Sequence, residues 1–212
     1  MIHISYSEEN TNKKVKTPLT KRGNKTRQKL LVAAEKVFGE TGYFQASIVD
    51  ITKEASVAQG TFYIYFPSKY AIFEELITQM SKDFRSKIKG EIGGVKDYQN
   101  VLRIGFRTFF SWVKEHRNLY SIVQQALLVD ENLYRSYYQR LAEGYIRELR
   151  EAVKSDDSLI DFDPETIAYS LMGISQFIGM RWVYWDNSDV PEPVFEDMMG
   201  IIFHGINGNL KE

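Results

Sequence analysis

The sequence predicts an all-α protein in which a small three-helix head is joined to a larger helical body, about nine helices in all. Apolar residues recur at helical spacing along most of the 212 residues, and no segment shows the alternation of a half-buried strand. Charge also divides the chain: residues 1–70 carry 11 Lys and Arg against 6 Asp and Glu, a net +5, and the rest carries 16 against 22, a net −6. A basic head on an acidic body is typical of a polyanion-binding module attached to a domain with another task.

We expect a disordered N-terminal arm over residues 1–19, the head over 20–67 and the body over 68–212. The arm is polar and carries lysines but no apolar signal region. The first helix of the head should run from Thr26 to Gly42, where the glycine ends it. Its apolar stripe consists of Leu30, Ala34, Val37 and Phe38.

The next two segments predict a helix-turn-helix. Ser47 is a suitable N-cap for the first of them, and Asp50 lies three residues later, as a capping box requires. After a tight turn, an aromatic helix begins near Gln59; Pro67 stops it and Ser68 caps the helix that follows. The core between the two helices should hold Ile48, Ile51, Ala55, Phe62 and Phe66.

The aromatic helix leaves small, hydroxyl and amide side chains pointing outward, which suits contact with phosphates and base edges. Gly60 has no Cβ, so the backbone there can approach a phosphate closely. The outward set is Gln59, Gly60, Thr61, Tyr63 and Tyr65. The alternative interpretation is an ordinary helical hairpin whose tyrosines pack on its own surface.

The run from Val57 to Lys69, VAQGTFYIYFPSK, resembles the recognition region of the TetR family of bacterial transcriptional regulators, and the likeness extends over roughly residues 20–80. Two positions depart from the family pattern: Ala58 stands where serine is frequent, and Ile64 where a polar or aromatic residue is frequent. The resemblance implies a head that binds double-stranded DNA. With the outward positions, it assigns the DNA contacts to Ser47, Ala58, Gln59, Gly60, Thr61, Tyr63, Tyr65 and Lys69.

Nearly every segment of the body has helical period. A long helix should follow Ser68 and end near Ile88, with Asp163 and Pro164 serving as N-cap and first residue of a later one. We place the other helices at about 97–115, 119–127, 131–154, 164–186 and 193–207.

The last two helices are apolar on more than one side, so a second stripe remains after one is buried. Either a second copy of the chain or a thick monomer core would cover it. Resemblance to the TetR family implies a homodimer through these helices, with two recognition helices about 34–36 Å apart, or a multiple of that, on a palindromic operator. We assign the interface to Met172, Gly179, Met180, Val183, Phe195, Met198, Met199 and Ile202.

The aromatic side chains of the body are either plain core or the lining of a ligand cavity. The resemblance implies the cavity, with a small-molecule inducer of apolar or amphipathic character. Arg181 would meet its polar end, unless the arginine has an acidic partner within the chain or is exposed. The proposed lining is Phe106, Phe109, Trp112, Tyr137, Phe177, Arg181 and Trp182.

Other kinds of chemistry find no motif in the sequence. The three histidines are isolated, there is no cysteine, and no phosphate-binding glycine loop is present, so we expect no catalytic residue, metal or cofactor. The apolar segment 167–185 is interrupted by Gln176 and Arg181, so no membrane span is expected and the location should be cytoplasmic. The favoured function is a sequence-specific DNA-binding repressor released by a ligand. The alternative is a helical interaction or adaptor protein without specific DNA binding.

Overall fold

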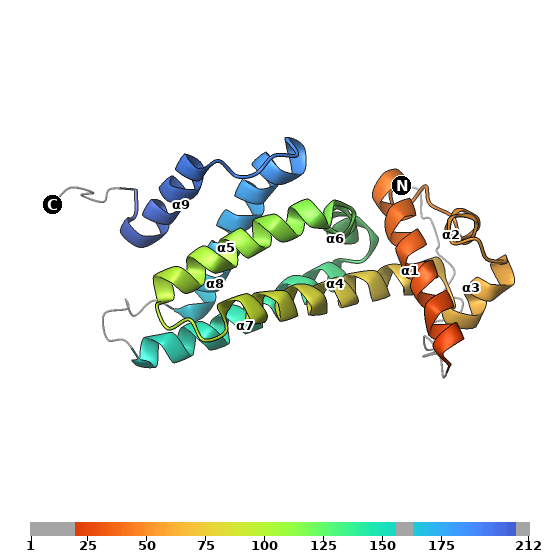
Figure 1. The fold of residues 1–212 in the computed structure, drawn as a ribbon, viewed down its shortest axis with the longest axis horizontal. Helices are drawn as coiled ribbons and strands as arrows, with labels where there is room; N and C mark the ends of the chain where they lie inside the picture. Colours follow the sequence, from red (N-terminus) through yellow and green to blue (C-terminus); the bar gives the residue numbers. More distant parts are fainter. Residues whose placement is uncertain (1–19, 156–162, 207–212) are drawn as a thin grey trace, which may run out of the picture. The chain divides into compact units, whose positions relative to one another are not determined.

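The computed structural model describes residues 20–155 and 163–206, and every regular element in these ranges is helical (Figure 1). The predicted arm, residues 1–19, lies outside the described residues. Two compact units divide the chain, Met1–Leu76 and Ile77–Glu212. The elements are α1 (Lys21–Thr41), α2 (Ile48–Glu54), α3 (Gln59–Tyr65), α4 (Lys69–Ile92), α5 (Tyr98–Glu115), α6 (Arg117–Val129), α7 (Glu131–Ser155), α8 (Pro164–Ile178), the π-helix η1 (Gly179–Trp185) and α9 (Glu192–His204).

Helix α1 begins five residues earlier than predicted. The Thr20 hydroxyl accepts a hydrogen bond from the Gly23 amide at 3.1 Å, so the threonine caps a helix start that apolar periodicity alone does not reveal. The other end is as predicted, because Gly42 adopts a φ of 78°, which favours glycine. All four residues of the predicted stripe of α1 are buried.

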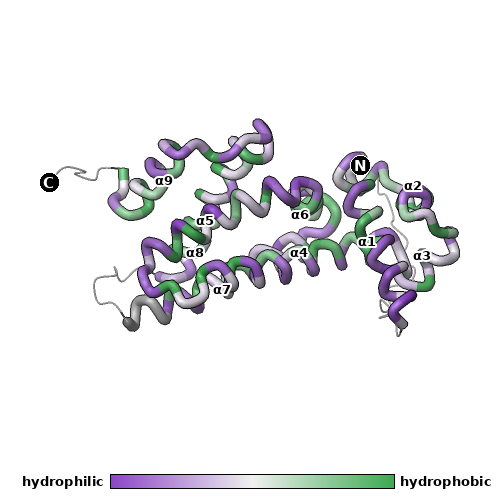
Figure 2. Tube along the Cα trace, in the orientation of Figure 1, coloured by the Kyte–Doolittle hydropathy of each residue, from purple (hydrophilic) through white to green (hydrophobic). Residues whose placement is uncertain are grey.

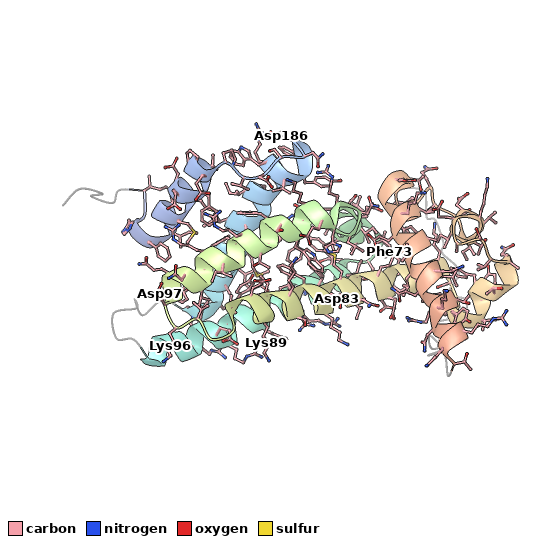
Figure 3. All side chains as sticks on the ribbon, viewed as in Figure 1. Phe73, Asp83, Lys89, Lys96, Asp97 and Asp186 are labelled. Atoms are coloured by element: carbon pink, nitrogen blue, oxygen red, sulfur yellow. The ribbon has the colours of Figure 1, made fainter. Side chains whose placement is uncertain are left out.

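The first two turns of α4 belong to the core of the head. Phe73, marked in Figure 3, is fully buried, and its ring centroid lies 5.4 Å from that of Phe38 and 4.7 Å from that of Tyr43. Arg27 and Glu75 form an ion pair at 2.8 Å. These contacts explain why the head extends to Leu76, about two helical turns beyond the predicted division at residue 67.

In the body, α5 packs against α8, η1 and α9 around one apolar core. Helices α6 and α7 pack together, and α7 packs on α8. Figure 2 shows hydrophobic and hydrophilic residues following one another at short intervals along these helices, the pattern of amphipathic helices that share a core. The buried residues of the α5 core are Leu102, Phe106, Phe110, Val113, Tyr120, Leu171, Val183, Phe195, Met198 and Met199.

The single helix predicted over 164–186 changes to π geometry at Gly179. This glycine is buried against α5, and a Cβ there would lie 3.0 Å from a ring carbon of Phe109. Arg117 supports the other end, since its guanidinium donates hydrogen bonds to the carbonyls of Val183 and Tyr184, both at 2.7 Å. A cation there also complements the partial negative charge of a helix C-terminus.

Ion pairs fix α9 on α5. Arg103 donates two hydrogen bonds to the carboxylate of Glu196, and one turn later Arg107 does the same with Glu192. The Arg107 guanidinium also lies 4.0 Å from the centroid of the Phe195 ring, between the two glutamates in the sequence. The matched spacing of the pairs sets the register of the two helices.

Candidate nucleic-acid interface

The N-terminus of α2 has the predicted capping box. The Asp50 amide donates to the Ser47 hydroxyl at 3.1 Å, and the Ser47 amide donates to the Asp50 carboxylate at 3.0 Å. The Ser47 hydroxyl also donates to that carboxylate at 2.6 Å, and this bond, followed by the amide bond, lowers the pKa of Asp50. Asp50 therefore stays charged at neutral pH and holds the start of the helix-turn-helix in place.

The turn between α2 and α3 is tight and has one unusual backbone conformation. Ser56 has a φ of 54°, in the left-handed region where residues other than glycine are uncommon. The next amide, that of Val57, donates to the Thr52 carbonyl at 3.0 Å, and Ala58 then begins α3 without a side-chain cap. This conformation could not be predicted from the sequence, because serine does not mark a left-handed turn as glycine does.

Helix α3 separates a buried face from an exposed one. Phe62 is fully buried, as is Phe66 immediately after the helix, whereas the Tyr63 side chain is 52% exposed. The predicted core is confirmed except for Ile48, which is only partly buried. Of the predicted contact residues, Ala58, Gln59 and Gly60 are also exposed, and Ser47, Thr61, Tyr65 and Lys69 are partly exposed. A Cβ on Gly60 would meet nothing within 4 Å, so nothing blocks approach to the backbone there.

Lys69 requires a correction, because its ammonium group is engaged inside the head. It donates to the carbonyls of Tyr43 and Ala46, both at 2.8 Å, and lies 4.5 Å from the Tyr43 ring centroid. Partial burial lowers the pKa of Lys69. Its main contact is therefore with the loop that leads into α2, and not with the solvent from which DNA would approach.

Four exposed apolar residues of the head were not predicted as candidates, and two of them, Val32 and Ile64, are 59% and 57% exposed. Phe44 is 63% exposed in the loop before α2, and Val49 is 56% exposed on α2 itself. Helical spacing places Val49 on the face of α2 opposite Ile48 and the fully buried Ile51, so its exposure could have been predicted from the sequence.

The predicted ligand cavity is not assembled as expected. Phe106, Trp112 and Tyr137 are buried, but Phe177 is 67% exposed and does not lie among them. Phe109 and Trp182 are partly buried. Trp112 is nevertheless unusual, because its indole N–H is buried with no hydrogen-bond partner among the described residues, and the same holds for the hydroxyl of Ser81. Ser81 and Phe84 both lie on α4, and the ring centroid of Phe84 is 5.6 Å from that of Trp112 on α5.

Arg181 is exposed and pairs with Asp186, which Figure 3 marks just after η1. Its guanidinium also lies 5.3 Å from the ring centroid of Trp182. This is the acidic partner that the sequence left open as an alternative, and it removes Arg181 from the predicted pocket. The sequence could not decide between the two, since five residues separate the partners and the turn after η1 brings them together.

Most of the predicted dimer interface is core of the same protomer. Five of its eight residues are buried against other parts of the chain, namely Gly179, Val183, Phe195, Met198 and Met199, and the other three are partly buried. The exposed apolar surface of these helices is a different set, which we call the outer face: Tyr169, Phe177, Trp185 and Ile201, at 43%, 67%, 61% and 51% exposure.

A groove adjoins the outer face between α6, α7 and α8. It has a volume of about 650 Å³, and Tyr169 and Phe177 line it together with Gly173, which lies one turn from each on α8. A glycine at that position leaves a hollow between two aromatic side chains. The remaining lining is Leu127, Glu131, Tyr134, Arg135, Tyr138, Gln139, Met172 and Gln176.

The described part of the chain has neither a membrane-crossing helix nor a metal site. None of its helices combines the length and the apolar character needed to cross a bilayer. Over the same residues, no three His, Asp or Glu side chains are grouped so that they could hold a metal ion.

Comparisons with known proteins agree with this architecture. Residues 30–76 match the family model described as bacterial regulatory proteins, tetR family. The uncharacterized HTH-type transcriptional regulator YvdT of Bacillus subtilis is 35% identical over 120 residues, which is 54% of this chain and 62% of that relative. The fatty acid metabolism regulator protein of the same organism is 25% identical over 183 residues, 84% of this chain and 94% of the relative.

The fold of the whole chain also has solved counterparts. The transcriptional regulator FadR from Bacillus subtilis, in complex with stearoyl-CoA, superposes with a TM-score of 0.75 at 21% sequence identity. That comparison covers 84% of this chain and 98% of the FadR chain. The all-helical fold with an N-terminal helix-turn-helix is therefore confirmed.

Proposed function

Because the chain belongs to the TetR family of bacterial regulatory proteins, we propose that it represses transcription as a homodimer on a palindromic operator and leaves the operator when an amphipathic small molecule binds. It is a DNA-binding regulator and not an enzyme, as its family and relatives are regulators. The observation that carries the proposal is the two-sided helix α3: Phe62 is buried, whereas Gln59, Gly60 and Tyr63 are exposed beside Ile64.

We assign the reading of bases to Gln59 and Thr61 and the binding of phosphates to Tyr63 and Tyr65. An amide can bond an adenine edge with two hydrogen bonds, whereas phenol hydroxyls bond phosphate oxygens without regard to sequence. Lys69 contributes indirectly in this assignment, since its bonds to Tyr43 and Ala46 hold the loop before α2. Ser47 and Asp50 likewise fix the start of α2.

The experiment is a fluorescence-anisotropy titration with duplex DNA from upstream of the protein's own gene. At about 0.15 M salt the wild type should keep a specific complex while a scrambled duplex dissociates. Gln59→Ala should lose about 1–3 kcal/mol of preference between single-base operator variants. The control is Gln99→Ala, an exposed glutamine of the body. Equal binding of both duplexes by the wild type would favour the adaptor alternative instead.

For the homodimer, we propose that the outer face of α8, η1 and α9 forms the interface. The predicted residues of the inner side are used within the protomer, so the exposed set is the one left for a second copy. The hollow at Gly173, between Tyr169 and Phe177, can receive an apolar side chain of the partner.

For the ligand, we propose a site beside Trp112 in the body. Its unpaired N–H and the unpaired Ser81 hydroxyl can bond a polar group of a bound molecule, and the neighbouring aromatic rings suit an apolar chain. Among the similar proteins, one is a fatty acid metabolism regulator and another is a FadR bound to stearoyl-CoA. An acyl compound is therefore the first class of ligand to test.

A further inference from the structure

A concave surface of the head lies between α1 and the end of α2, next to the turn that leads into α3. We call it the lysine groove: a hollow of about 460 Å³ between one face of α1 and the end of α2. Helix α1 supplies Lys25, Gln28, Lys29, Val32, Ala33 and Lys36, and the opposite wall consists of Glu54, Ala55 and Ser56.

The charge of the groove is uneven along its length. Lys36 forms an ion pair with Glu54 at 2.8 Å, which neutralises one end. Lys25 and Lys29 are exposed one turn apart on α1, and neither pairs with a carboxylate among the described residues. Three lysines against one glutamate leave a net +2, concentrated where these two ammonium groups stand.

The floor and far wall of the groove also suit an extended anion. Val32 is 59% exposed between the lysines, and Ala33 and Ala55 are small and buried, so the floor is shallow and apolar. The exposed Ser56 lies opposite, held in its left-handed conformation. Its hydroxyl is a neutral donor of the kind that often bonds phosphate oxygens.

The groove is continuous with the proposed DNA-binding surface. Ser56 ends one wall of the groove, and Ala58, two residues later, begins α3. We expect DNA that contacts the start of α3 to pass this wall with its sugar–phosphate backbone. On the grounds of charge and continuity, we propose that the lysine groove binds the phosphodiester backbone through Lys25, Lys29 and Ser56.

This inference rests on the proposed function but adds a sequence-independent contact to it. Each lysine that neutralises a phosphate releases condensed counterions, so it contributes about 0.9 to the slope of log K against log salt concentration. It contributes nothing to the choice between sequences. Losing both lysines should therefore lower the slope without altering operator preference.

The test compares the double variant Lys25→Ala, Lys29→Ala with wild type on two duplexes, the operator and a scrambled sequence, from 0.05 to 0.3 M salt. Because a homodimer carries four of these lysines, the slope should fall by about 3.6 on both duplexes, about 0.9 for each lysine. The ratio of the two affinities should stay unchanged. The double variant Lys25→Arg, Lys29→Arg should retain the wild-type slope. Circular dichroism should show wild-type helix content, because neither lysine has a partner to lose.

The matched control removes two exposed lysines from the body, Lys82→Ala with Lys89→Ala, the second of which Figure 3 marks. It changes the net charge equally and should leave the slope as in wild type. An unchanged slope in the groove variant, on both duplexes, would overturn the inference, and so would an equal loss in the body variant. If wild type fails to prefer the operator, the proposed function fails, yet the slope on scrambled DNA still decides the role of the groove.

Discussion

The buried indole N–H of Trp112 has no hydrogen-bond acceptor among the residues that the structure describes. A buried N–H without an acceptor costs about 1–3 kcal/mol, and proteins rarely retain such a group without use. Burial also raises the pKa of the Tyr137 hydroxyl on α7, which stays neutral across physiological pH. A ligand with an acceptor for the Trp112 N–H would form this hydrogen bond and remove the free-energy cost of the unpaired group. Such a ligand should therefore bind more tightly.

Replacing Trp112 with phenylalanine keeps an aromatic ring and removes the donor. We expect Trp112→Phe to bind the operator like wild type but to need roughly 3 to 10 times more acyl ligand for release, the loss of one neutral hydrogen bond. Titration of the DNA complex with ligand measures this directly. Trp185→Phe, at a tryptophan that is 61% exposed, is the control and should behave like wild type. Equal release of all three proteins would place the ligand elsewhere.

For single residues, the sequence predicted which side of a helix a residue occupies better than it predicted which group a charged side chain binds. The outward positions on α3 follow from helical spacing, which two buried phenylalanines fix. The partners of Lys69 and Arg181 did not follow from the sequence, because a long charged side chain can turn toward a carbonyl or a carboxylate that only the folded chain brings near. The acceptors of Lys69 lie 23 and 26 residues away along the chain.

Among the elements, α2 is the one whose stability should depend on acid. The pKa of Asp50 is lowered in the folded state, so its contribution is complete above the ordinary aspartate value of 3.8 and is lost as the pH falls through the folded value. Asp50→Ala should therefore lower the hydrogen-exchange protection of residues 48–54 at pH 7.

This difference from wild type should disappear below the folded pKa, where the wild-type carboxyl is protonated as well. Glu40→Gln, an exposed carboxylate of α1, serves as the control and should match wild type at every pH. A difference that persists unchanged into acid would mean that the carboxylate charge of Asp50 does not hold the helix.

The π-helix η1 is the element that the sequence could not predict. Periodicity finds apolar residues on a helix, but α and π turns differ too little over seven residues to be separated that way. The cause lies outside the segment, in the close packing of Gly179 on Phe109 and in the carbonyls that Arg117 binds. The change from α to π geometry rotates the side chains after residue 178 relative to a continuous α-helix. This helps explain why residues of η1 that were predicted at the interface pack against the core.

For the whole molecule, the outer face makes a prediction about assembly. Phe177→Glu should give monomers with normal helix content and an operator affinity lowered by orders of magnitude, because two half-sites need two linked heads. Met198→Glu should instead unfold the body, since a charge there would be buried at a position that is 4% exposed. Sedimentation equilibrium at micromolar concentration and circular dichroism distinguish these outcomes. A dimeric Phe177→Glu protein with full affinity would refute this interface.

The general plan of the molecule was accessible from the sequence because each part has strong local signals. Caps at Ser47 and Asp163 mark helix starts, and the structure has a side-chain bond at each. The assignment of faces in the body was not accessible, since α8 and α9 are apolar on more than one side. Which side is buried depends on α5, whose arginines pair with Glu192 and Glu196.

The distribution of tryptophan gives the molecule a built-in optical label. All three indoles, Trp112, Trp182 and Trp185, belong to the unit that begins at Ile77, and none belongs to the DNA-binding head. Because the head has no tryptophan, bases that contact α3 touch no indole there. Any change in tryptophan emission when operator DNA is added to the unlabelled protein would report a rearrangement relayed from the head into the body, and its amplitude would measure the coupling on which induction depends.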